Sequence, residues 1–232
     1  MMKNNIKENV KKIIEDLPQG VKIVAAAKGK TGLQVLESVE AGIKIVGENY
    51  IKDAKDIYNK IKGKAALHFI GIPDKTKHDL LRRTNLMMFD MIETVNSFEI
   101  AEEINQKCAQ INKIMPIMIE INSGEEKQKA GVLPENTIDI VKRISKLSNL
   151  KIKGLMTMGS TPHNSMENPE DRKRARDCFK KTKKLFDEIK NLDLANVEMK
   201  YLSMGMSYSY KIALEEGANM LRIGSKIYGK RK

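Results

Sequence analysis

The sequence predicts an α/β fold, a (β/α)8 TIM-type barrel with an extra N-terminal helix, formed by a single domain of residues 1–232. Short apolar runs, each as long as a buried strand, alternate with helical patterns along the chain. Four of these runs begin near residues 22, 44, 66 and 88, in equal steps of 22 residues that indicate a repeated strand-helix unit. With four later runs, eight strands fit a chain of 232 residues. An open, doubly wound sheet is the alternative.

The first twenty residues predict an amphipathic helix. Its apolar side chains recur at helical spacing on one face: Ile6, Val10, Ile13, Ile14 and Leu17. The pattern ends at Pro18 and Gly20, and it contains neither a continuous apolar core nor a small-residue cleavage site. We therefore expect no signal peptide. Because no later stretch is apolar enough to span a membrane, we also expect no membrane association and a cytoplasmic protein.

Residues 21–50 predict a strand-helix-strand unit. The apolar run 23–27 has the smoothness of a strand buried on both faces, and it ends at Lys28. A helical pattern follows, with Leu33, Leu36 and Val39 on one face, before a second apolar run begins at Ile43. The two strands should be parallel, which places Lys28 at the carboxyl end of a buried strand.

The second half of the chain continues the alternation. Apolar runs follow at residues 115–121, 151–158, 199–204 and 220–224. Helical patterns lie between strands at residues 96–111 and 134–147, and both open with polar residues that can cap a helix. Irregular stretches follow the fifth and sixth strands, at residues 122–133 and 159–168. In a barrel, these stretches lie on the functional face.

The net charge of +12 raises the hypothesis of a nucleic-acid partner. The densest basic cluster, residues 172–184, also carries apolar side chains at helical spacing, as at Ala175 and Phe179, so it is typical of an amphipathic helix with a solvated basic face. Only 5% of residues are aromatic, and they do not interleave with the basic ones as in base-stacking surfaces. We expect no nucleic-acid partner.

Metal ligation is not predicted. Cys108 and Cys178 lie in apolar helical patterns without a CxxC partner, which is typical of buried thiols. The three histidines, His68, His78 and His163, are scattered without the spacing of a zinc site. We therefore propose no metal ligands.

Two interpretations of Lys28 are open. A lysine at the end of a strand is most often solvated. Alternatively, Lys28 lies in a pocket with small side chains, where desolvation and nearby positive charge lower its pKa and allow its amine to form a Schiff base with a carbonyl. Position alone does not choose between them.

The seventh and eighth strands lead into a predicted phosphate site. Strand seven continues into Ser203-Met204-Gly205-Met206-Ser207, just before a helix expected near Tyr208, and strand eight continues into Gly224 and Ser225. Serine hydroxyls, backbone N–H groups at a glycine turn and a helix N-terminus bind phosphate, and loops seven and eight of such barrels commonly form this site.

Arg222 lies two residues before Gly224, so both point to the same side of strand eight. It is either a core arginine paired with a carboxylate or a donor to a ligand ring nitrogen. In a closed barrel, strands one and eight are neighbours, which brings Lys28 and Arg222 together. A Schiff-base lysine, a phosphate site and an arginine at the ring nitrogen together fit pyridoxal 5'-phosphate (PLP).

The chain resembles the pyridoxal phosphate homeostasis protein family, single-domain relatives of the alanine racemase N-terminal barrel. The resemblance rests on six motifs in order: GENY (47–50), HFIG (68–71), SGEE (123–126), GLMTM (154–158), LSMGMS (202–207) and RIGSKIYG (222–229). It implies that Lys28 is the covalent cofactor lysine and that Arg222 faces the pyridine nitrogen. It also implies that Ser207, Gly224 and Ser225 hold the phosphate and that Asn49 borders the ring.

The resemblance implies a function in intracellular PLP (vitamin B6) homeostasis without established catalytic residues or turnover. An arginine at the ring nitrogen leaves that atom unprotonated, which weakens the ring as an electron sink. The alternative is a fold-type III PLP enzyme such as an amino-acid racemase. Racemases with this barrel use a tyrosine from an additional C-terminal domain, which we do not expect here; the candidate bases are Tyr201, Tyr208, Tyr210 and His163.

Some residues depart from the family pattern. Ala27 and Gly29 replace two hydroxyl residues that usually flank the cofactor lysine, and residues 72–77 differ from the usual continuation of HFIG. Cofactor binding should survive, because Lys28, Ser207, Arg222 and Ser225 are present. The expected partners are PLP and, as recipients, PLP-dependent apoenzymes. We expect a monomer.

Overall fold

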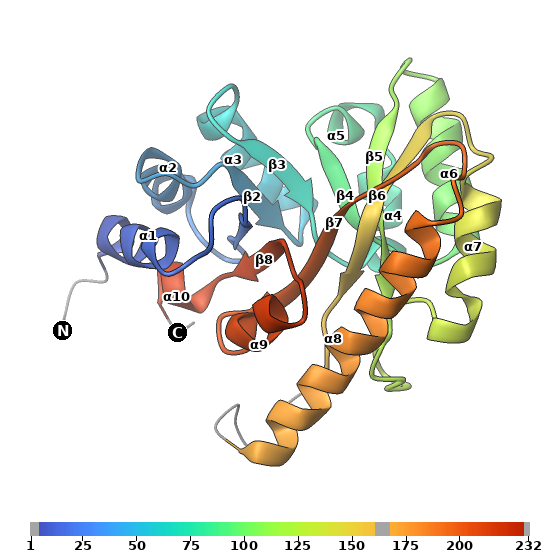
Figure 1. Ribbon diagram of the computed structural model, residues 1–232. Helices are drawn as coiled ribbons and strands as arrows, with labels where there is room; N and C mark the ends of the chain where they lie inside the picture. Colours follow the sequence, from blue (N-terminus) through green and yellow to red (C-terminus); the bar gives the residue numbers. More distant parts are fainter. Residues whose placement is uncertain (1–4, 161–167, 230–232) are drawn as a thin grey trace.

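The computed structural model describes residues 5–160 and 168–229. Eight strands in this part of the chain form a closed barrel in sequence order, and every neighbouring pair is parallel. The helices lie outside the barrel, and helix α1 precedes the first strand (Figure 1). The predicted (β/α)8 barrel with an extra N-terminal helix is therefore confirmed, and the open sheet is excluded.

The strands are β1 (Lys22–Ala26), β2 (Ile45–Glu48), β3 (Ala66–Phe69), β4 (Met91–Val95), β5 (Met115–Ile121), β6 (Leu150–Thr157), β7 (Val197–Met206) and β8 (Met220–Ile223). The helices are α1 (Ile6–Glu15), α2 (Gly32–Glu40), α3 (Ile51–Ile61), α4 (Pro73–Leu80), α5 (Arg83–Leu86), α6 (Phe98–Ala109), α7 (Thr137–Ile144), α8 (Pro169–Lys190), α9 (Tyr210–Glu215) and α10 (Ser225–Tyr228). A 3-10 turn, Pro134–Asn136, precedes α7.

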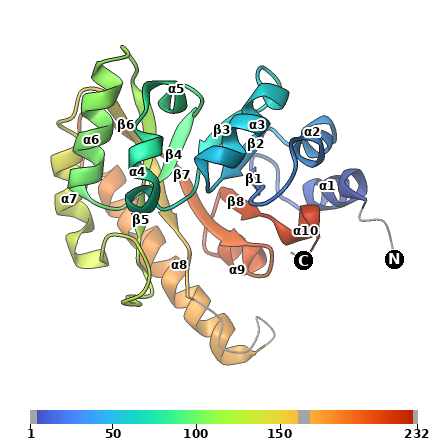
Figure 2. The same ribbon diagram turned by 180° about the vertical axis from the view of Figure 1, so that it is seen from behind.

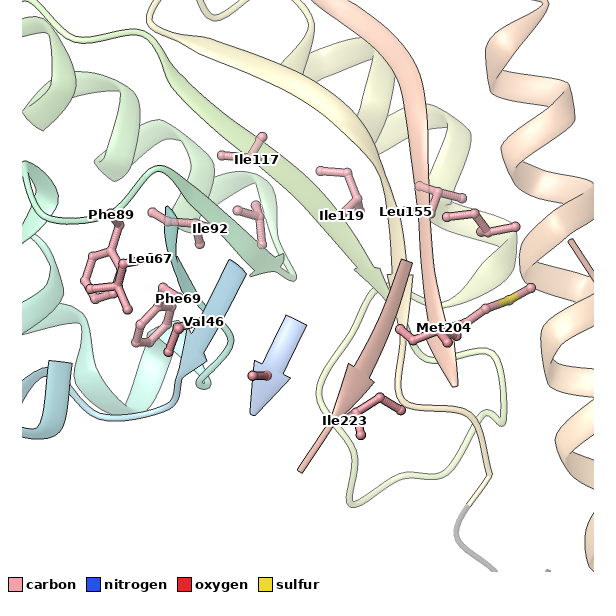
Figure 3. Packing of buried hydrophobic residues seen from close by; sticks show 14 of the residues in the cluster. Val46, Leu67, Phe69, Phe89, Ile92, Ile117, Ile119, Leu155, Met204 and Ile223 are labelled. Carbon is pink, nitrogen blue, oxygen red and sulfur yellow. The ribbon is translucent and has the colours of Figure 1, made fainter. Parts of the chain in front are cut away.

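The strands bury apolar side chains on both faces, as their smooth hydrophobic runs predict. Outward-facing residues such as Ile117, Ile119 and Leu155 belong to the large core between the strands and the helices (Figure 3). Inward-facing residues form a second, smaller cluster consisting of Val24, Met91, Met118, Met156 and Met220. Methionine is flexible enough to fill the irregular space inside a narrow barrel. This inner cluster lies beneath the polar residues of the site.

Several predicted boundaries differ from the structure, among them the following. Strand β4 begins at Met91 rather than Met88, because Met88 belongs to the turn that ends α5, where its N–H donates to the carbonyl oxygen of Asn85 at 3.1 Å. The helix predicted over residues 134–147 starts as a 3-10 turn and ends at Ile144. The helix expected near Tyr208 begins at Tyr210, because residues 207–209 form the turn that leaves β7.

The basic cluster lies on α8, the long helix that extends past the end of the barrel (Figures 1 and 2). Many of its cations have acidic partners. Arg176 forms ion pairs with Glu215 and Glu216, and Lys181 pairs with Glu125. These pairs reduce the basic field that a polyanion would meet. Among the described residues, no helix has the length and apolar character required to cross a membrane.

Candidate functional site

A cavity of about 350 Å³ lies at the carboxyl ends of β1, β7 and β8. Its wall includes five of the six predicted site residues: Lys28, Ser207, Arg222, Gly224 and Ser225. The pairing of β1 with β8 brings them together, with Val24 opposite Arg222 in the register. The structure thus confirms the prediction that the first and last strands are neighbours, which brings Lys28 and Arg222 to one cavity.

Lys28 follows β1 by two residues and is half-buried. Its Nζ atom lies 4.9 Å from the ring centroid of Tyr50, close enough for a cation–π interaction. Lys30 lines the same cavity. Neither Tyr50 nor Lys30 was predicted as a site residue, although Tyr50 lies within the GENY motif.

Ser207 connects the two loops that were predicted to bind phosphate. Its buried Oγ atom accepts hydrogen bonds from the backbone N–H groups of Gly224 and Lys226, both at 3.3 Å. A Cβ atom at Gly224 would lie 3.2 Å from the carbonyl oxygen of Ala26, so a larger residue would press the two strands apart. The loops after β7 and β8 are therefore held together at the cavity wall.

Arg222 is 4% exposed and projects into the barrel from β8. Its Nη1 donates to the carbonyl oxygen of Ser203 at 2.9 Å and to Ser203 Oγ at 2.8 Å, and its Nη2 donates to the carbonyl oxygen of Thr157 at 2.6 Å. Burial lowers the pKa of Arg222, whereas the nearby carboxylates of Glu93 and Glu120 raise it. An arginine fixed in this way presents a rigid positive charge at the cavity.

A carboxylate supports Arg222 indirectly. Ser203 Oγ donates to Glu93 Oε2 at 3.0 Å, and Glu93 Oε1 lies 2.6 Å from Nδ1 of His68. Glu93 and His68 are both buried inside the barrel. Of the two interpretations of Arg222, a core arginine paired with a carboxylate is therefore met only indirectly, because the Ser203 hydroxyl bridges Arg222 and Glu93. Sequence analysis missed this network, because its members are far apart in the chain.

Asn49, the sixth predicted residue, lines a second cavity of about 360 Å³. Its Nδ2 donates to the carbonyl oxygen of Ile70 at 3.1 Å, which fixes the side chain at the barrel mouth. Met206 lines both cavities, so they are neighbours. The second cavity also contains Thr94 and Glu120, which sequence analysis did not single out.

The candidate bases lie in different places. Tyr208 lines the first cavity and is 67% exposed. Tyr201 packs against the inner methionine cluster, and the Tyr210 hydroxyl donates to Asp16. His163 and the rest of residues 161–167 lie outside the described residues.

Other surface features hold none of the predicted residues. A more open groove of about 670 Å³ is lined by residues of α4, α5 and α6, including Arg83 and Lys107. No group of three or more histidine, cysteine, aspartate or glutamate side chains that could hold a metal ion occurs within residues 5–160 and 168–229.

Comparison with known proteins places the chain in a family. Residues 2–232 match the model of the alanine racemase N-terminal domain. The pyridoxal phosphate homeostasis protein of Aquifex aeolicus is 32% identical over 99% of this chain and 96% of its own length. The human protein of the same name is 32% identical over 90% of this chain and 76% of its own length. The chain belongs to the pyridoxal phosphate homeostasis protein family.

Solved structures share the family's fold. PipY of Synechococcus elongatus, determined with PLP bound, has a TM-score of 0.80 and 21% identity, with 97% of this chain and all (100%) of PipY covered. Alanine racemase of Clostridium difficile has a TM-score of 0.77 and 18% identity, and this chain covers 57% of its length. At these identities the likeness concerns the fold.

Proposed function

We propose that this protein binds PLP, holds it covalently through Lys28 and acts in the homeostasis of this cofactor in the cell. The observation that carries the proposal is the convergence of Lys28, Arg222 and Ser207 on one cavity of about 350 Å³. Relatives that match nearly the whole chain are named for PLP homeostasis, and PipY has been determined with PLP bound.

The residues present fit the cofactor. Its phosphate requires hydrogen-bond donors, and the hydroxyls of Ser207 and Ser225, which both line the cavity, can supply them. The absence of a side chain at Gly224 leaves the backbone open to close approach. Its ring nitrogen accepts hydrogen bonds, and Arg222 is the buried donor in the cavity wall. We assign Asn49 to the edge of the ring.

The bound cofactor supplies an aldehyde carbon that bonds to a primary amine and a pyridine ring that can withdraw electrons. Lys28 presents the amine, half-buried beside the Tyr50 ring. The guanidinium of Arg222 remains charged and has hydrogen-bond donors but no acceptor atom. A ring nitrogen that accepts its hydrogen bond is therefore unprotonated. This weakens electron withdrawal by the ring and therefore disfavours reactions that pass through a carbanion.

An enzymatic function is the second candidate, because Tyr208 lines the cavity and is exposed. A fold-type III enzyme such as an amino-acid racemase needs an acid/base group at this position. The test is exchange of the α-proton of amino acids into deuterated water by the native protein and Tyr208→Phe. Exchange that Tyr208→Phe abolishes supports an enzyme; no exchange across a broad panel supports cofactor binding alone.

The proposal extends to the protein's partners and organisation. We propose that residues 1–232 act as one domain, as a monomer, in the cytoplasm, and that PLP-dependent apoenzymes receive the cofactor. A transfer assay would measure the activity gained by an apoenzyme mixed with the loaded protein. It should exceed the activity gained from the same concentration of free PLP in the presence of a PLP-trapping agent.

Cofactor binding is tested by spectral titration with PLP. The native protein should develop a yellow absorption band with saturating behaviour. Lys28→Ala should lose the band and bind at least about tenfold more weakly, because the covalent bond is removed. Lys22→Ala is the matched control, since Lys22 lies at the opposite, exposed end of β1. Equal behaviour of the two variants would refute the assignment of Lys28.

A further inference from the structure

The second cavity contains buried oxygen atoms that lack hydrogen-bond partners. Glu120 Oε2 and Thr94 Oγ1 both lie in side chains that line it, and neither atom has a partner. Glu120 is 5% exposed and Thr94 is 2% exposed. Buried polar atoms are almost always hydrogen-bonded, because an unpaired one costs about 1–3 kcal/mol. Ser160, which lines the same cavity, has a buried Oγ atom that also lacks a partner. Unpaired oxygens gathered on one cavity wall indicate a missing donor.

The positive charges nearest to Glu120 are engaged elsewhere. Arg222 directs its hydrogen bonds to Ser203 and Thr157, and Lys129 at the rim of the cavity pairs with Glu126 at 2.9 Å. Burial raises the pKa of Glu120 to about 7; Arg222 opposes the rise, and Asp74 adds to it. Glu120 can therefore ionise near neutral pH, and a cation placed against it would favour the ionised form.

The rest of the wall is mainly apolar. Ile70, Met156, Met158 and Met206 line the same cavity. A volume of about 360 Å³ admits a small molecule with a short alkyl body. The Lys129 ammonium at the rim disfavours a ligand with a second positive charge. The complementary ligand has a single ammonium group and an apolar body.

We propose that this cavity binds a small primary amine, with its ammonium group between Glu120 and Thr94 and its alkyl body against the methionines. The ammonium donates hydrogen bonds to Glu120 Oε2 and Thr94 Oγ1. It is also the positive counter-ion of the ionised Glu120 carboxylate. Because Met206 lines both cavities, the amine lies beside the pocket that contains Lys28. Asn49, assigned to the edge of the cofactor ring, lines this cavity, whereas the residues assigned to the phosphate and the ring nitrogen do not.

The test uses the full chain freed of PLP, so that no aldehyde can react with the amine and the outcome does not depend on the proposed function. Isobutylamine and isobutanol are compared at pH 8 by saturation-transfer NMR, with dissociation constants from competition titration. Isobutylamine should bind at least tenfold more tightly than isobutanol, which has nearly the same shape but no charge. Equal affinities would overturn the proposal.

Variants locate the binding. Glu120→Gln keeps the shape of the side chain and should remove the preference for the amine, and Thr94→Val should weaken amine binding about threefold or more. Glu125→Gln is the matched control, since Glu125 is an exposed carboxylate on the following loop, where it pairs with Lys181. Unchanged amine affinity in both Glu120→Gln and Thr94→Val, with native circular dichroism spectra, would refute the site. If Glu120→Gln does not fold, Thr94→Val decides alone.

Discussion

Replacing Glu48 by glutamine should remove a loss of stability that the native protein undergoes as the pH rises. Glu48 is the last residue of β2 and is fully buried; its Oε2 accepts the N–H of Asn49 at 3.2 Å, whereas its Oε1 has no partner. Burial raises the pKa of Glu48 to about 8, and the negative charge of Asp53 adds to the rise. The folded protein therefore keeps this carboxyl protonated at pH 7.

The direction of the effect follows from proton binding. Between the unfolded value of 4.5 and the folded value of about 8, the folded state of Glu48 holds a proton that the unfolded state has released. The stability that protonated Glu48 contributes is therefore fully present below pH 4.5 and is lost as the pH rises through 8. From pH 5 to pH 8.5 the native protein should lose about 4 kcal/mol relative to Glu48→Gln, or about 2.5 kcal/mol if the folded pKa is one unit lower.

The assay is urea unfolding of the cofactor-free native protein, Glu48→Gln and Glu40→Gln at pH 5 and pH 8.5. Glu40, exposed at the end of α2, is the matched control and should follow the native protein at both pH values. Any stability cost of glutamine that is the same at both pH values cancels, because the difference between the two pH values isolates the titration. A difference between pH 5 and pH 8.5 that is the same for Glu48→Gln and the native protein would refute the account of Glu48.

Three further substitutions test the framework of the site. Arg222→Met should lower the free energy of unfolding by about 3–5 kcal/mol in urea, because it leaves the carboxylates inside the barrel without their cation; a loss below 1 kcal/mol would contradict this. Gly205→Ala should lower the thermal midpoint measurably, since Gly205 has φ of +91° and a Cβ there would lie 2.6 Å from Cβ of Ala213. Ser207→Ala should cost about 1–3 kcal/mol in unfolding free energy, because two N–H groups lose their acceptor, and should also weaken PLP binding in a spectral titration. Native PLP affinity in Ser207→Ala would exclude it from the phosphate site.

The carboxyl ends of the first and last strands were the most predictable part of this protein. The buried run before Lys28 and the run before Gly224 are local signals, and a closed parallel barrel necessarily places the first strand beside the last. The cavity around Lys28 could therefore be assembled from sequence. Its residues are contributed by elements whose order along the chain equals their order around the barrel.

The barrel interior could not be predicted in this way. Glu93 and Glu120 are single charged residues within apolar runs, and nothing local indicates that one supports Ser203 while the other lacks a partner. These contacts join residues as far apart as Glu93 and Ser203, across the barrel. The start of β4 was also misplaced, because the apolar residue Met88 belongs to the turn that ends α5 rather than to the strand.

Covalent mapping of the cofactor tests the central claim most directly. The protein is loaded with PLP, reduced with borohydride, digested and analysed by mass spectrometry. The account predicts one phosphopyridoxyl group per chain, on the peptide that contains Lys28, and loss of the yellow band on reduction. An adduct spread over surface lysines, or placed mainly on Lys30, would contradict the assignment of Lys28 as the residue that holds the cofactor.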